Sequence, residues 1–130
     1  MFRSKYSARG EYRERESQRT KDSATLATRF PELKTLTADI TYFAQDGRTK
    51  GTQFHNEVNV AFAKSVFRFD CLNHECVGGD FDLSEVIARA VARQEASVTG
   101  EVQCQGWLSK TTIDRIRCHQ LLRYTLSLGY

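Results

Sequence analysis

Alternation of apolar and polar residues predicts four β-strands. The first covers residues 35–42, where every second side chain is apolar, as in a strand with one buried face. A second strand is predicted over residues 58–70, and the parity of its apolar positions changes near residues 63–65, which indicates a bulge or bend. The third and fourth strands are predicted over residues 98–104 and 118–130.

Helical spacing appears in two other segments. Over residues 82–94 apolar side chains recur at intervals of three, four, seven and eight, and Asp82 is a suitable N-cap. A shorter helix is predicted to begin near Asp22 or Ser23 and to end at Pro31, because a proline ring clashes with the preceding helical turn.

The resulting order, α-β-β-α-β-β, favours an α+β fold: a four-stranded, mostly antiparallel sheet in two hairpins, with a packed helix. If the helix at 82–94 is a crossover within one sheet, the second and third strands run parallel. A length of 130 residues fits one domain with an ordinary hydrophobic core. We expect that domain to cover residues 22–130.

Residues 1–21 are predicted to form a mobile basic arm. They contain few side chains that could pack, and residues 1–34 carry nine Lys and Arg against five Asp and Glu. Such an arm suits nucleic acid or an acidic partner. The alternative is a solvated terminus with mixed charges, because the excess is small.

Apolar runs are short throughout the chain. No stretch approaches the roughly 18 apolar residues of a membrane span, and the N-terminus lacks the apolar stretch of a secretory signal. We therefore expect a cytoplasmic protein that makes no membrane contact. Thiols stay reduced in that compartment, so clustered cysteines are more typical of a metal site than of disulfides.

Four cysteines make up the chemically distinctive group in the chain. Cys71 and Cys76 are separated by four residues, and Cys104 and Cys118 follow after gaps of 27 and 13 residues. The predicted topology places strand ends or beginnings near three of them and brings all four to one end of the sheet. Zn²⁺ accepts a closed tetrahedron of thiolates, so we predict a structural zinc site there.

Other interpretations of the cysteines stay open. Free cysteine is among the most buried residue types, so the thiols could be buried and unpaired, and disulfides are a further alternative. His74, inside the first loop, could replace one cysteine ligand. His119 is a weaker substitute, because on a strand it would point away from Cys118.

We therefore expect a small non-catalytic, zinc-stabilised binding module, with nucleic acid as one candidate partner. Aromatic stacking and positive charge would come from Trp107, Lys110, Arg115, Arg117 and Arg123. The first alternative is protein–protein interaction or self-association, in which the C-terminal strand is an edge strand that pairs a homodimer. A thiol- or zinc-dependent enzyme is the least favoured alternative, because the chain contains no HExxH or deaminase motif.

Overall fold

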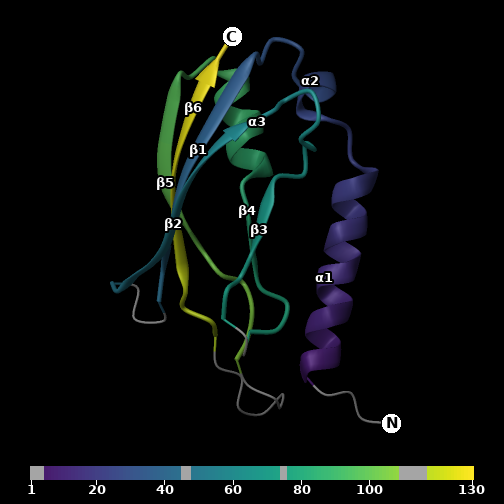
Figure 1. Ribbon diagram of the computed structural model, residues 1–130, viewed down its shortest axis with the longest axis vertical. Helices are drawn as coiled ribbons and strands as arrows, with labels where there is room; N and C mark the ends of the chain where they lie inside the picture. Colours follow the sequence, from purple (N-terminus) through teal and green to yellow (C-terminus); the bar gives the residue numbers. More distant parts are fainter. Residues whose placement is uncertain (1–4, 45–47, 74–75, 109–116) are drawn as a thin grey trace.

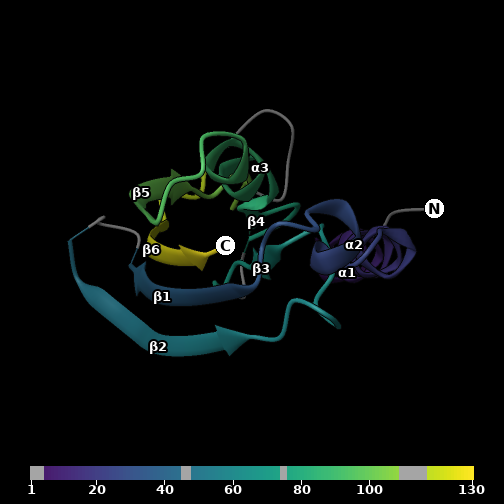
Figure 2. The same cartoon turned by 90° about the horizontal axis from the view of Figure 1, so that it is seen from above.

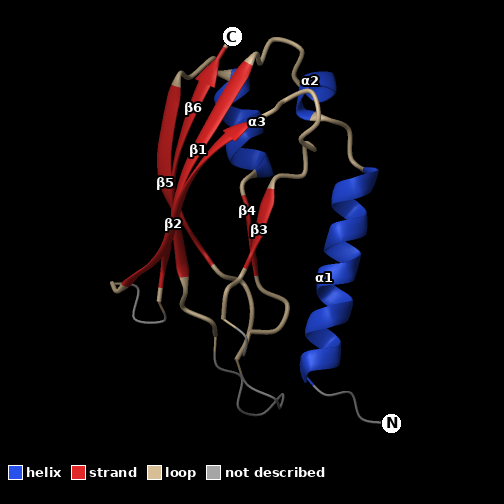
Figure 3. Cartoon of the chain, in the orientation of Figure 1, coloured by secondary structure: helices blue, strands red, loops and turns tan. Residues whose placement is uncertain are grey.

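The computed structural model describes residues 5–44, 48–73, 76–108 and 117–130, with side chains described from residue 10 onward. Within these ranges the chain has the predicted α+β architecture. It consists of a four-stranded antiparallel sheet, a two-stranded sheet and three helices (Figures 1 and 3).

The four-stranded sheet has the strand order β2-β1-β6-β5, and each neighbouring pair is antiparallel. Its strands are β1 (Thr35–Phe43), β2 (Lys50–Val58), β5 (Ser97–Gln103) and β6 (Leu121–Gly129). The central strands β1 and β6 pair along their whole length. Buried and more exposed side chains alternate along these two strands, except at the end of β1, where two consecutive residues are buried. One face of the sheet therefore packs against the hydrophobic core.

A second, smaller sheet lies over that core. It pairs β3 (Arg68–Asp70) with β4 (Asp80–Asp82), and α3 (Ser84–Ala92) follows β4 directly. Figures 1 and 2 show α3 and the small sheet on the same side of the large sheet. Helix α1 (Lys5–Asp22) lies on the far side of the small sheet, and α2 (Leu26–Arg29) connects α1 to β1.

Aromatic side chains hold the small sheet on the large one. Phe69 and Phe81 are cross-strand partners, and Phe81 is fully buried. Its ring meets Tyr42 of β1 edge-on, with centroids 5.7 Å apart, while Phe69 lies 5.7 Å from Phe54 of β2. Edge-to-face and tilted rings at these distances add to the stabilisation from buried area.

Helix α3 occupies the segment predicted to be helical, although it begins two residues later. The N-cap is Leu83 rather than the predicted Asp82. Asp82 lies one residue earlier, and its Oδ1 accepts hydrogen bonds from the Ser84 backbone N–H (2.9 Å) and hydroxyl (2.5 Å). Ile87, Ala90 and Val91 form the buried stripe. Gln94 follows with a φ of 52°, the left-handed conformation that commonly ends a helix.

The predicted second strand, residues 58–70, is wrong. The strand that pairs with β1 is β2, Lys50–Val58, and most of its side chains are exposed. It lies at an edge of the sheet and lacks a clear apolar alternation. The change of parity inside 58–70 marks a passage to the other sheet, because β3 begins at Arg68. The expected parallel pairing is also wrong, since β2 and β5 are opposite edges of the large sheet.

Both chain ends differ from expectation. The N-terminal segment is helical in α1, whereas its mobility and the domain boundary at residue 22 stay predictions. The short helix begins after its N-cap Thr25 rather than at Asp22 or Ser23. The C-terminal strand β6 is central, so it is not the edge through which we expected a homodimer. Among the described residues, no helix has the length and apolar character needed to cross a membrane.

We predict that Phe81→Ala lowers the free energy of unfolding by about 3–5 kcal/mol, because it removes a fully buried ring that joins the two sheets. Urea unfolding followed by circular dichroism measures this change. Phe62→Ala is the matched control: its ring is 78% exposed, so the expected change is below about 0.5 kcal/mol. Equal effects of the two variants would contradict this account of the core.

Candidate metal centre

The four cysteines come from two hairpin loops. Cys71 directly follows β3 and Cys76 lies in the β3–β4 loop, whereas Cys104 directly follows β5 and Cys118 lies just before β6. In Figure 1 both loops lie at the lower end of the molecule. Each hairpin therefore contributes two sulfur atoms, and residues far apart in sequence meet at one point.

The four sulfur atoms form one compact group, with all Sγ atoms within 4.8 Å of one another. Cys71 and Cys118 are 3.7 Å apart, and Cys76 and Cys104 are 3.5 Å apart. A disulfide would need about 2.05 Å, and these are free cysteines. A zinc tetrathiolate with Zn–S bonds of about 2.3 Å has sulfur–sulfur edges of about 3.8 Å. The spacing thus suits a shared metal ion.

Backbone hydrogen bonds hold the two loops together. Val77 and Trp107 exchange a pair of N–H···O=C bonds of 2.8 and 3.0 Å across the loops. Within the second loop, the Cys118 N–H donates to the Gly106 carbonyl (3.0 Å). The Gly106 N–H donates to Cys104 Sγ (3.4 Å). The sulfur group therefore rests on a fixed frame of backbone.

Two glycines allow this close approach. A Cβ on Gly79 would collide with Cys76 Sγ and Cys104 Sγ, and a Cβ on Gly106 would collide with Cys76 Sγ and with the backbone of Gly79. The sulfur atoms fill the space that side chains would otherwise take. Glycine at these positions is a steric requirement of the cluster.

Electrostatics favour a cation in the centre. All four cysteines are buried, at 0–2% exposure. Hydrogen bonding to the Cys104 thiol holds the pKa of Cys118 well below its ordinary value, and the reciprocal contact with Cys118 raises the pKa of Cys104. Without a cation, the group cannot release all its protons, because thiolates this close repel one another. A divalent ion would compensate that charge.

The four cysteines could hold a metal ion. Four thiolates form a soft, tetrahedral site of the type taken by zinc and by iron–sulfur chemistry. If all four thiolates bound one ion, no coordination position would be left for substrate, as in structural rather than catalytic zinc sites.

The structure separates the two histidines considered as substitutes. His119 is exposed, and its Nδ1 is 3.2 Å from Gln103 Nε2, so it does not join the sulfur group. His74 lies outside the described residues.

The residues predicted to bind nucleic acid do not form one group in the structure. The Arg117 guanidinium lies 5.3 Å from the centroid of the Trp107 ring. Arg123, on β6, binds Glu101 at 2.7 Å and lies over the Phe43 ring. Lys110 and Arg115 lie outside the described residues. Only Trp107 and Arg117 are thus seen to lie together.

Two polar contacts of Cys71 have no signal in the sequence. The Arg13 guanidinium of α1 donates to the Cys71 carbonyl at 3.1 Å, and the Cys71 thiol donates to Gln120 Oε1 at 3.5 Å. Both partners are distant in sequence, and neither belongs to a motif. The glycines had a weak signal, since Gly79 and Gly106 lie within three residues of a cysteine.

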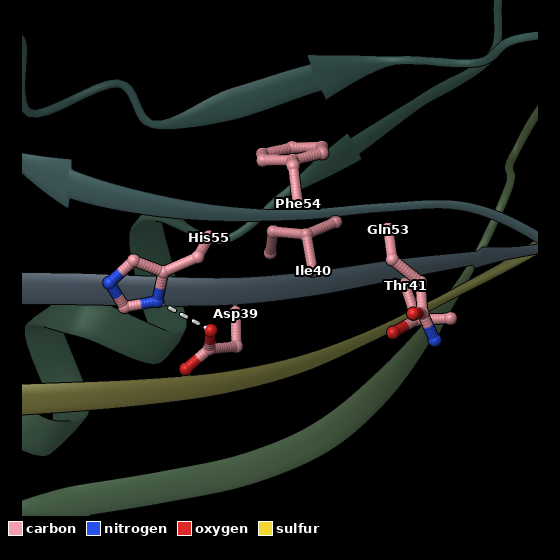
Figure 4. Close-up of a pocket in the computed structure, with 6 residues that line it drawn as sticks. All are labelled: Asp39, Ile40, Thr41, Gln53, Phe54 and His55. Carbon is pink, nitrogen blue, oxygen red and sulfur yellow. Dashed lines mark hydrogen bonds and ion pairs between the residues drawn. The ribbon is translucent and has the colours of Figure 1, made fainter.

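On the outer face of the large sheet, His55 and Asp39 form a polar pair. His55 Nδ1 lies 2.6 Å from Asp39 Oδ1, in a shallow hollow between β1 and β2 (Figure 4). The hydrogen bond to Asp39 raises the pKa of His55 above its ordinary value. Both side chains are 55% exposed, so the pair is a solvated surface feature.

Comparison with known proteins adds no relative. No family model, curated protein or solved structure matches this chain. The function must therefore be argued from the site itself.

We predict that Gly106→Ala destabilises the chain by about 1–3 kcal/mol, because the added methyl group overpacks the space between Cys76 Sγ and Gly79. Gly51→Ala is the control: on the exposed strand β2, its new Cβ would meet only ordinary contacts of 3.4 Å or more. Urea unfolding of both variants measures the difference. A Gly106→Ala protein as stable as Gly51→Ala would show that the loops are not tightly packed.

Proposed function

We propose that Cys71, Cys76, Cys104 and Cys118 bind one zinc ion through four thiolates, and that the ion stabilises a non-catalytic binding module. The observation that supports this most strongly is the approach of four buried sulfur atoms to within 4.8 Å of one another. A zinc ion there would tie the small sheet to the large one through two loops. Its binding energy would then contribute directly to folding. A cytoplasmic location, where the thiols stay reduced, fits this proposal.

Nucleic acid is the partner class that we propose for the module. The supporting feature is the stacked pair Trp107 and Arg117, which lies on the loop between Cys104 and Cys118. A flat aromatic ring beside a guanidinium suits stacking on an unpaired base and contact with phosphate. The metal would then position this loop, so that stability and binding depend on one site.

We predict that the purified chain contains about one zinc ion, measured by elemental analysis. Replacing any one of the four cysteines by serine should lower zinc affinity by more than about 100-fold, beyond the loss typical of a residue that merely orients a ligand. A chelator competition measures the affinity, and Co²⁺ substitution should give the absorption of a tetrahedral thiolate complex. Removal of the metal should lower the midpoint of urea unfolding.

His74→Ala is the matched control for these cysteine variants, because His74 lies between Cys71 and Cys76 in sequence. It should keep about one zinc ion and nearly the parental affinity. A protein that folds with four reactive thiols and takes up no zinc or cobalt would exclude the metal proposal. Loss of zinc in His74→Ala with retention in a cysteine variant would instead change the ligand set.

We predict that a labelled single-stranded oligonucleotide binds the zinc-loaded chain at low salt. The logarithm of the association constant should fall linearly with the logarithm of the salt concentration. The slope should be about −0.7 multiplied by the number of phosphates neutralised. Trp107→Ala should weaken binding by about 1–3 kcal/mol, the contribution of one stacked base. Phe62→Ala, which removes an exposed aromatic ring outside the metal loops, should leave it unchanged. Fluorescence anisotropy decides between these outcomes, and absence of binding at low salt removes nucleic acid as the partner.

A further inference from the structure

Helix α1 has almost no apolar surface with which to pack. Among residues 10–22, Tyr12 is the only large apolar side chain, and the described part of α1 shares no extensive backbone contact with any strand. A helix of this composition is marginal on its own in water, and most helices in proteins are stabilised by an apolar stripe. Something other than hydrophobic burial must therefore hold α1 in place.

The surface beneath α1 is charged. In the small sheet the side chains alternate, so that Phe69 and Phe81 pack against the core while Arg68, Asp70, Asp80 and Asp82 are available to the other side. Three carboxylates against one guanidinium make this face acidic. The inward side of α1 presents arginines to it.

Polar contacts connect the described part of the helix to this face. Arg19 donates to Asp82 Oδ2 at 3.1 Å, and Arg13 donates to the Cys71 carbonyl at 3.1 Å. Glu16 lies 3.9 Å from Arg68, and a side-chain hydrogen bond joins Tyr12 to Asp80. Such contacts weaken as salt screens them, because the Debye length falls from about 10 Å at 0.1 M to about 3 Å at 1 M.

Removal of α1 would leave the Arg68 guanidinium, a nearly buried charge beneath the helix, still paired. Asp82 would lose Arg19 but keep its hydrogen bonds from Ser84. The Arg68 side chain is only 9% exposed, yet it keeps Asp80 at 2.9 Å and Asp70 at 2.8 Å. Its contact with Glu16 is the longest of the three. An unpaired buried guanidinium would oppose release of the helix, and this pairing avoids it.

We propose that α1 is a releasable strap, held on the acidic face of the β3–β4 hairpin by ionic contacts, which can detach while the rest of the fold stays intact. Release exposes the Cys71 carbonyl and the hairpin carboxylates, and it frees Arg13 and Arg19 for an acidic partner. Tyr12 is the one aromatic anchor in this part of the helix. The proposal does not depend on the identity of the metal or on nucleic-acid binding.

Hydrogen exchange of the full chain, read by mass spectrometry at about 0.05 M and 0.5 M NaCl, tests the strap. Amides of α1 should exchange at least about tenfold faster at the higher salt, because the detached helix frays, while amides of β1 and β6 change less than about twofold. A double variant, Arg13→Gln with Arg19→Gln, should show the faster α1 exchange already at low salt.

The matched control removes the same charge from the outer side of the helix, as Arg15→Gln with Lys21→Gln, both exposed residues. It should retain slow α1 exchange at low salt. Two results would overturn the strap: α1 protection that resists both salt and the inward double variant, or loss of protection in α1 and the central strands together. The first means that other contacts hold the helix, and the second means that α1 is part of the cooperative fold.

Discussion

The meeting of two hairpin loops at the four cysteines is the contact on which the arrangement of the two sheets depends. The small sheet has only three residues in each strand, too few to be stable alone. Aromatic rings anchor its inner side, and the Val77–Trp107 backbone pair joins its loop to that of β5 and β6. The sulfur group lies beside this pair, so a metal ion there would add a further connection between the two loops.

The alternation of side chains in the β3–β4 hairpin gives it two different faces, one toward the large sheet and one toward α1. Its aromatic side faces the large sheet, with Phe81 fully buried and Phe69 partly buried, whereas its charged side faces α1. The strength of attachment therefore decreases outward, from buried rings to ion pairs that solvent and salt weaken. A fold built in this way separates a cooperative body, formed by the two sheets and α3, from an outer helix with its own, lower stability.

Local sequence patterns were sufficient to predict the position of a strand or helix where that element has one apolar side. Strands β1, β5 and β6 and helix α3 lie near their predicted positions, because alternation or helical spacing is visible in the sequence. Strand β2 and helix α1 are polar on nearly all sides, so their structure depends on pairing with β1 or on contacts with the small sheet, which no local pattern records. The cysteines were expected together for a partly wrong reason: the convergence comes from two antiparallel hairpins rather than from a parallel crossover. Glycine is required at Gly79 and Gly106 because the two loops meet there. This requirement could not be predicted from the sequence without knowing that the loops meet.

The positive charge of the N-terminal segment has a different meaning in the folded chain. Arg13 and Arg19 are engaged with the body, and the outer side of α1 carries a mixture of charges, so the docked helix offers little attraction to a polyanion. An acidic partner would instead meet the Trp107–Arg117 pair beside the cysteines. Arg13 already contacts Cys71 at that end. A partner that also competes for Arg13 would favour the released helix, and by linkage release of the helix would strengthen binding of that partner to the same extent.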